Sequence, residues 1–268
     1  MYLLSKLVSP DGITVLFNGS SGIRSYTLHS SYKDYNVALA DLQDENYLGF
    51  IEHIDRAEAL VAYGKGKLQV VAGQVTWTGN SLVLTEGMTK YVLRLASLSL
   101  PLTAFENFLS NLELNPSYNS RQQLFSFIEH NDITLTEDGG MIFYKKVQDD
   151  LYDLHTGRTF RFAPGTIHEM PRNLVDDNSS VGCSAGIHAA SLAYAKSFHA
   201  DKKTIVLLKV YPKDVVSVPH DSEFQKVRAC RVHVVGKHQD RKDLGPLWED
   251  HYFEESDAFV DDDADSSF

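Results

Sequence analysis

Three residues whose side chains can carry chemistry lie close together in one polar stretch of the chain. The stretch reads NLVDDNSSVGCSAGIHAASLAYAKSF and spans residues 173 to 198. Asp176 could act as a base or a ligand, and Cys183 becomes a nucleophile if a base lowers its pKa. His188 follows on a short predicted strand. Asp176, Cys183 and His188 are therefore the candidate catalytic residues of a reaction centre or a nucleotide site.

The same stretch also has a purely structural interpretation. Asp176 and its three polar successors form a turn cluster whose side chains can bond their own backbone. Gly182 and Gly186 permit tight backbone geometry, and Cys183 can pack as a small apolar residue. His188 would then be a core histidine with a hydrogen-bond partner. We adopt this interpretation and assign no catalytic residue, while the three side chains remain candidates.

Metal binding is a third hypothesis for this region. Four chemically suitable zinc ligands lie within 34 residues, namely His155, His168, Cys183 and His188. Their spacing matches no standard zinc finger or zincin motif, and the chain has 11 histidines in all. We expect no metal ion and no cofactor. Nearby, Lys145 and Lys146 lie on opposite faces of a predicted strand, where one of them could point inward and pair with Asp153 or Asp176.

The charge of the chain is distributed unevenly. The 268 residues carry a net charge of −11, and 43% of them are hydrophobic. Residues 249–268 hold nine acidic residues and no Lys or Arg, whereas the first 248 residues hold 27 acidic and 25 basic residues. The sequence contains no strong basic patch, so we expect no direct binding to nucleic acid. No apolar run approaches the roughly 20 residues needed to span a bilayer.

The acidic tail is a candidate for protein binding. It reads EDHYFEESDAFVDDDADSSF, which interleaves aromatic residues with acids. This pattern resembles the acidic, Phe-ended tails of single-stranded-DNA-binding proteins, in which the aromatic end enters an apolar pocket of a partner and the acids meet a basic rim. The predicted partner-binding residues are Phe253, Phe259, Asp261, Asp262, Asp263, Asp265 and Phe268.

The overall pattern predicts an α+β protein. We expect a small mixed N-terminal module over residues 1–95 and a helical hairpin over residues 96–131. A β-rich C-terminal domain over residues 132–240 and a disordered acidic tail over residues 241–268 complete the organisation.

Several elements have clear signals of their own. Apolar periodicity predicts helices within residues 30–44, 53–66, 101–116 and 119–132, the last two beginning at Thr103–Glu106 and Ser120–Gln123 capping boxes. Strands are predicted over 12–19 and 67–84, in a hairpin around the turn at Asp138, and over 204–219. Residues 227–236 are predicted to be a single strand with alternating faces.

Three long segments resemble the phage rapid-lysis rIIB family. They are FENFLSNLELNPSYNSRQQLFSFIEHNDITLTEDGGMIFYKKV, MPRNLVDDNSSVGCSAGIHAAS and VYPKDVVSVPHDSEFQKVRACRVHVV. The resemblance implies a protein of a tailed phage that works with a larger rIIA partner at or near the host inner membrane. It also implies an effect on lysis timing and on resistance to host exclusion, with no established reaction.

The sequence thus predicts a non-enzymatic phage protein that acts through protein–protein interaction with an rIIA-like or host protein. We expect it in the host cytoplasm, attached peripherally at the inner membrane through that partner, in an oligomeric state that the sequence leaves open. One alternative is an enzyme or nucleotide-binding domain, because the pattern from Gly186 to Tyr194 resembles a strand-then-helix element of ADP-ribosyltransferase-like folds. The other is a DNA-metabolism accessory that docks through the acidic tail.

Overall fold

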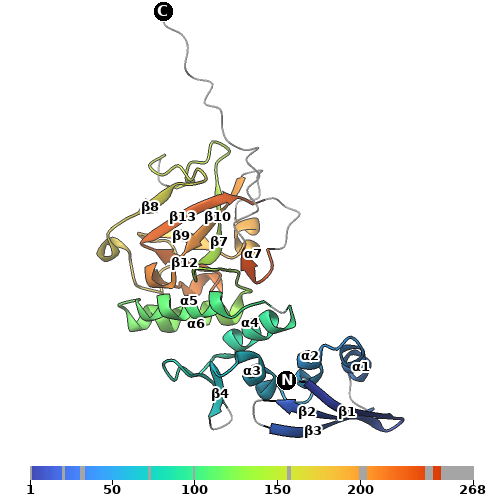
Figure 1. Ribbon diagram of the computed structural model, residues 1–268. Coiled ribbons are helices and arrows are strands. Elements are labelled where there is room, and N and C mark those ends of the chain that lie inside the picture. The colour runs from blue at the N-terminus through green and yellow to red at the C-terminus, as the bar shows by residue number, and fades with distance from the viewer. Residues whose placement is uncertain are drawn as a thin grey trace, which may run out of the picture. The chain divides into compact units, whose positions relative to one another are not determined.

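The protein is a mixed α+β chain, as the sequence predicted. A computed structural model describes residues 2–19, 22–30, 34–71, 74–98, 100–155, 158–198, 204–238 and 244–248, and the tail residues predicted to bind a partner lie outside them. The chain divides into two compact units, residues 1–102 and residues 103–268. Figure 1 shows the elements of each unit.

The first unit begins with a three-stranded antiparallel meander. Its strands are β1 (Tyr2–Ser9), β2 (Gly12–Gly19) and β3 (Gly22–His29), of which the sequence predicted β2 alone. Alternation along β2 points Ile13, Val15 and Phe17 to one face, where all three are buried. The helices α1 (Tyr35–Gln43), α2 (Tyr47–Glu52) and α3 (Arg56–Gly64) supply the other half of this core.

A small hairpin and a longer helix complete the first unit. The hairpin consists of β4 (Leu68–Val71) and β5 (Gln74–Trp77), as predicted. The helix α4 (Glu86–Ser97) was not predicted. The Thr85 hydroxyl caps it by accepting a hydrogen bond from the Met88 backbone, and Met88, Val92 and Leu95 form its buried stripe.

The second unit is built on one large sheet. Among the described residues its nine strands are β6 (Leu135–Thr136), β7 (Met141–Val147), β8 (Ile167–Glu169), β9 (Ile187–Ala190), β10 (Thr204–Val210), β11 (Val215–Ser217), β12 (Lys226–Ala229), β13 (Arg231–Lys237) and β14 (Leu247–Trp248). Seven follow the order β11-β12-β9-β7-β10-β13-β8, and β6 joins β14 to β7. The helices α5 (Thr103–Glu113) and α6 (Tyr118–His130) lie side by side along this unit (Figure 1), and α7 (Leu192–Ser197) packs near β7.

The prediction of one strand over residues 227–236 was wrong. The strand is interrupted at Cys230, whose backbone forms hydrogen bonds with Asp214 and Met170 instead of with a neighbouring strand. Before the break β12 pairs with β9 and β11, and after it β13 pairs with β10 and β8. The predicted alternation of faces holds along β13, while every residue of β12 is buried.

The predicted capping box at Ser120 and Gln123 was also wrong. The helix α6 begins one turn earlier, where the Ser117 hydroxyl accepts a hydrogen bond from the Ser120 backbone. The Ser120 hydroxyl instead donates to the Val216 carbonyl at 2.6 Å, and the Gln123 amide oxygen accepts from the Val218 backbone at 2.9 Å. Both side chains therefore hold the helix to the β11 region.

Asn115, between α5 and α6, is a fully buried polar link to the same region. Its amide nitrogen donates to the carbonyls of Pro212 and Val215, both at 2.8 Å. Its amide oxygen accepts from the Ser117 backbone at 3.0 Å and from the Arg172 guanidinium at 2.9 Å. Every hydrogen-bonding capacity of this side chain is thus used, which offsets the cost of burying it.

Replacing Asn115 should therefore destabilise the second unit. We expect Asn115→Ala to lower the free energy of unfolding by about 3 kcal/mol, because it removes the four hydrogen bonds of a fully buried side chain, one of them from Arg172. In a Trp77→Phe background, Trp248 is the sole tryptophan, so its fluorescence during urea unfolding reports this unit. The exposed Ser110→Ala should change little, and a loss below about 1 kcal/mol for Asn115→Ala would refute the assigned role.

Candidate functional site

The second unit contains a pocket of about 360 Å³ beside the strands β7, β9 and β12. Its walls come from these strands, from α7 and from two loops, one around residues 153–162 and one around residues 183–186. The volume falls within the range of small-molecule sites, which runs from about 300 to 1,000 Å³. Segments that are far apart in the sequence therefore meet at one concave site.

Aromatic side chains form much of the pocket wall. Tyr194 and Phe198, four residues apart at the α7 end, stack with ring centroids 5.7 Å apart and planes at 21°. The His155 ring meets Phe198 edge-on at 5.7 Å. Phe160 and Phe162 enter from the neighbouring loop, where Phe162 is buried. The wall can thus hold a flat ring.

A buried ion pair lies in the same wall. The Lys145 ammonium is 3.0 Å from an Asp153 carboxylate oxygen, and their side chains are only 13% and 9% exposed. Lys145 also lies 3.5 Å from the His188 carbonyl oxygen and 5.0 Å from the Phe162 ring centroid. The predicted inward-facing lysine is therefore Lys145, and its partner is Asp153.

A second lysine reaches the pocket from β12. The Lys226 side chain is 6% exposed and its ammonium is 3.1 Å from Asp221, whose side chain is 46% exposed. The same ammonium is 5.7 Å from the Tyr194 ring centroid. In the described part of the chain, three lysines and one aspartate line the pocket, Lys146 being the third lysine. The charged side chains of the wall are thus predominantly positive.

His188 lines the pocket as a neutral imidazole. Burial and the nearby Lys145 lower its pKa to about 4. Its Nε2 atom is 2.9 Å from the Ser184 carbonyl oxygen, which can only accept a hydrogen bond. Nε2 therefore carries the proton, and Nδ1 of the neutral ring is an acceptor.

The structure separates the candidate catalytic residues. Cys183 is exposed and lines the pocket together with His188. Asp176 does not line it: one carboxylate oxygen lies 3.8 Å from the Arg228 guanidinium and the other accepts from the Asn178 backbone at 2.9 Å. The carboxylate that joins Cys183 and His188 at the pocket is Asp153.

Arg228 on β12 is a fully buried cation. Its guanidinium donates to the carbonyls of Val181 and Asn178 at 2.7 and 2.5 Å, and to the Ser217 hydroxyl at 3.1 Å. Arg228 was not among the residues predicted from the sequence, because the alternation of faces indicated an ordinary strand position. Its partners fix the loop that carries Cys183 and Ser184 to the pocket.

Removing this guanidinium should destabilise the second unit and loosen the loop. We expect Arg228→Met to lower the free energy of unfolding by about 3 kcal/mol, because the loop loses its charged hydrogen bonds to the sheet and the buried Ser217 hydroxyl loses a donor. Limited proteolysis should then cut within residues 176–184 sooner than in the parent chain.

The matched control is Arg231→Met, whose side chain is 44% exposed and 3.6 Å from Glu169. A surface ion pair of this kind contributes little to stability. The free energy of unfolding of Arg231→Met should therefore stay within about 0.5 kcal/mol of the parent value, and its proteolysis should follow the parent pattern. Equal effects of the two substitutions would contradict the role assigned to Arg228.

The lowered pKa of His188 predicts a pH-dependent stability. The unfolded chain binds a proton at this residue below about pH 6.5 and the folded chain only below about pH 4. The stabilisation is complete above pH 6.5 and is lost as the pH falls toward 4. Between pH 7 and pH 5 it should fall by about 2 kcal/mol.

His188→Gln keeps a side-chain donor for the Ser184 carbonyl but does not titrate in this range. Urea unfolding of the parent and the variant, each in the Trp77→Phe background, gives the contribution of His188 as the difference between their pH profiles. Parallel profiles from pH 7 to pH 5 would show that His188 is not buried as a neutral ring.

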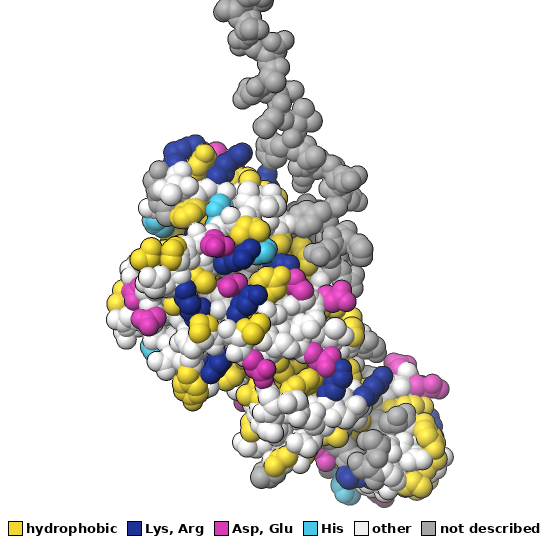
Figure 2. Space-filling view, turned by 60° about the vertical axis from the view of Figure 1, so that its left-hand side comes forward, with side chains coloured by type: hydrophobic (Ala, Val, Ile, Leu, Met, Phe, Trp, Pro, Cys, Tyr) yellow, Lys and Arg dark blue, Asp and Glu magenta, His cyan; other side chains and the backbone are white. Residues whose placement is uncertain are grey.

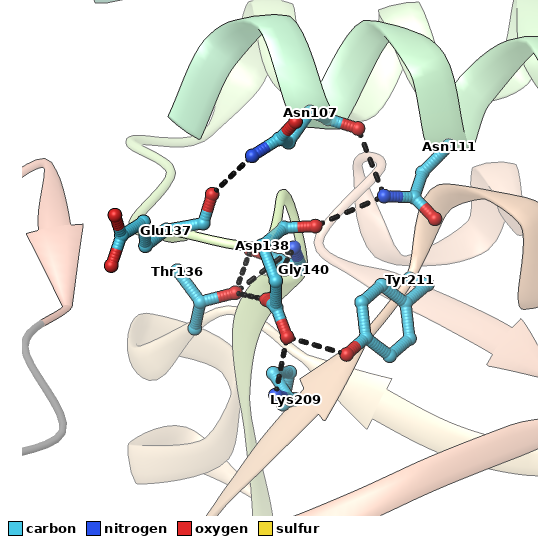
Figure 3. Close-up of polar contacts among 8 residues, drawn as sticks. All are labelled: Asn107, Asn111, Thr136, Glu137, Asp138, Gly140, Lys209 and Tyr211. Carbon is cyan, nitrogen blue, oxygen red and sulfur yellow. Dashed lines mark hydrogen bonds and ion pairs between the residues drawn. The ribbon is translucent and has the colours of Figure 1, made fainter. Parts of the chain in front are cut away.

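A second polar cluster surrounds Asp138 in the β6–β7 turn (Figure 3). Its carboxylate accepts hydrogen bonds from the Thr136 hydroxyl, from Lys209 at 2.9 Å and from the Tyr211 hydroxyl at 2.6 Å. Burial alone raises the pKa of Asp138, but these donors outweigh it and hold the pKa far below its usual value. The carboxylate is therefore already saturated with partners.

The same turn is held directly against α5. Asn107 and Asn111 donate to the carbonyls of Glu137 and Asp138 at 2.8 and 3.1 Å (Figure 3). Gly139 has φ +82°, and a Cβ there would lie 2.2 Å from the Asn107 backbone carbon. This cluster joins the hairpin to the helix, and we interpret it as structural.

The outer sheet face of the first unit is a second candidate surface. We use this name for Tyr2, Leu7, Leu16 and Ile23, which the strand register places on the side of the meander opposite its buried core. Tyr2, Leu7 and Ile23 are 57%, 67% and 63% exposed. Exposed apolar groups gathered on one face are typical of interaction sites.

The described residues also bear on the hypotheses of a metal site and of membrane attachment. Within the described ranges, no three His, Cys, Asp or Glu side chains gather as a potential metal site. His168 lies on β8, with Nε2 3.2 Å from the Thr166 hydroxyl. None of the described helices combines the length and apolar character needed to cross a bilayer.

Comparison with known proteins confirms the predicted resemblance. The family model described as bacteriophage T4 protein rIIB matches residues 7–244, which extend over both units. Protein rIIB of Enterobacteria phage T4 is 30% identical over 224 residues, which cover 83% of this chain and 70% of that protein. No solved structure matches the chain. The chain therefore belongs to the family of bacteriophage T4 protein rIIB.

Proposed function

We propose that this rIIB-family protein acts during phage infection by binding another protein, and thereby affects lysis timing or the escape from host exclusion. The partner is an rIIA-like phage protein or a host protein. The proposal rests on the exposure of large apolar side chains on the outer sheet face, because a folded unit ordinarily buries side chains of this kind unless they contact a partner.

The chemistry of this surface restricts its partner. The other side chains that share the face with its four apolar residues are polar and include no Asp, Glu, Lys or Arg, namely Ser5, Ser9, Thr14, Asn18, Ser25, Thr27 and His29. β1 is also an edge strand, so its outer backbone groups can pair with an added strand. We propose a partner segment that is apolar, uncharged and extended.

The acidic tail is proposed as a second point of contact. Phe253, Phe259, Phe268 and the acids around them lie outside the described residues, so their role rests on composition. Nine acids without a basic residue favour a basic partner surface with an apolar pocket. Attachment at the host inner membrane would then be peripheral and would occur through the partner.

The surface charge gives less support to a nucleic-acid partner. On the face of the second unit shown in Figure 2, Lys and Arg side chains are interspersed with Asp and Glu. Proteins that bind nucleic acid usually gather their basic residues into one patch or stripe. The proposal therefore includes no direct contact with nucleic acid.

Affinity capture from infected cells tests the protein-binding proposal. The full chain, a Leu7→Ser/Ile23→Thr double variant and a chain without residues 249–268 serve as baits, with mass spectrometry as the readout. We expect the double variant to lose a partner that the full chain captures, because two exposed apolar anchors are removed from the outer sheet face. Loss of a partner by the truncated chain would support the role of the tail.

The captured partner is then purified for a direct measurement of affinity. The double variant should bind it at least about tenfold more weakly, the loss expected for removing one or two interface anchors. Val37→Ser is the matched control, because Val37 is an apolar residue of α1 that is 56% exposed. If neither altered bait loses a partner, or if the control loses the same one, the proposal fails.

A further inference from the structure

We infer that the pocket of the second unit binds a nucleotide, with the base against its aromatic wall and the phosphate near Lys145 and Lys226. This inference concerns a different unit and a different class of ligand from the proposed protein partner. We propose that the pocket binds the nucleotide, and we propose no reaction there.

The aromatic wall selects for a ligand with a flat ring. Tyr144, Phe160, Phe162, Tyr194 and Phe198 all line a space of about 360 Å³. Stacking on such side chains contributes substantially to the binding of bases and tolerates any base, because each base has a π-face. A small inorganic anion would leave most of this wall without contacts.

The charges of the wall select for an anionic group on that ligand. Lys145 and Lys226 are 13% and 6% exposed, so their charges act in a medium that screens them less than water does. The partner of Lys226 is Asp221, which is 46% exposed and can be solvated if the ammonium turns to a phosphate. Among the described residues of the wall, Asp153 is the one carboxylate, against three lysines.

His188 and Asp153 add acceptors for the neutral part of the ligand. Nδ1 of the neutral His188 ring is an acceptor, because Nε2 carries the proton that bonds the Ser184 carbonyl. Carboxylate and imidazole acceptors suit the hydroxyl groups of a ribose or the amino group of a base. A fatty acid has an anionic head and an apolar body but offers no such donors, so the wall fits a nucleotide better.

Isothermal titration calorimetry of the full chain tests this assignment. The probes are adenosine and uridine 5′-monophosphate, with adenosine and ribose 5-phosphate as fragments that lack one recognised part. We expect at least one mononucleotide to bind at a single site with a Kd below about 1 mM, and both fragments to bind at least about tenfold more weakly. No heat from either mononucleotide at millimolar concentration would overturn the inference.

Two substitutions then locate the bound nucleotide. Lys226→Met removes a charged hydrogen-bond donor, and Tyr194→Leu removes a stacking ring, so each should weaken binding about tenfold or more. Lys196→Met is the matched control, because Lys196 is exposed on the same helix as Tyr194 but does not line the pocket. It should change the affinity less than about twofold.

Thermal unfolding of each variant separates lost binding from lost folding. If one pocket variant does not fold, the other still decides the outcome, because the two alter different segments of the chain. Unchanged affinity in a folded Lys226→Met or Tyr194→Leu chain would place the nucleotide elsewhere and overturn the inference. Loss of a protein partner from the outer sheet face would not affect this result.

Discussion

The buried charge of Arg228 is the constraint on which the second unit depends. A guanidinium that is buried away from water needs hydrogen-bond acceptors within the protein. Those of Arg228 are the Asn178 and Val181 carbonyls and the Ser217 hydroxyl. The polar loop must therefore turn back over β12. Gly182 and Gly186 allow this close approach. A Cβ at position 182 would collide with the Asp221 carboxylate, and a Cβ at position 186 would crowd Val175 and the Arg228 side chain.

The pocket is a consequence of that same turn. Once the loop is fixed over the sheet, Cys183 and Ser184 form one wall and β9 presents His188 beside Lys145. The buried Lys145–Asp153 pair fixes the opposite loop in a similar way. Two buried cations thus shape the site by determining where their acceptors lie, whereas the apolar core determines where the strands lie.

Local patterns in the sequence were enough to predict part of this fold. The helices at residues 103–113 and 118–130 have a clear apolar stripe, and the hairpin at Asp138 has a strong turn signal. β1 was missed because apolar residues point to both of its faces, which removes the alternation that identifies a strand. The break at Cys230 was missed because it is set by contacts with Asp214 and Met170, far away in the sequence.

The site was predicted less completely, for the same reason. Its conspicuous residues, Cys183 and His188, were identified because their types are chemically reactive. Lys226 and Phe162 carry no local signal, since a lysine in a strand and a phenylalanine in a loop occur in any protein. Asp176 is chemically suited to such a site, but it pairs with Arg228 and does not line the pocket, and this ion pair is apparent only in the folded structure.

The short strand β14 has a mechanical consequence for whatever follows it. It pairs with β6 in the main sheet, Trp248 is buried, and the Leu135 backbone bonds the Pro246 carbonyl. The next twenty residues are thus tethered at a fixed point of the second unit, with a contour length of roughly 70 Å. A protein captured by them would be held at a high effective concentration beside the domain, so a weak second contact would suffice to complete a stable complex.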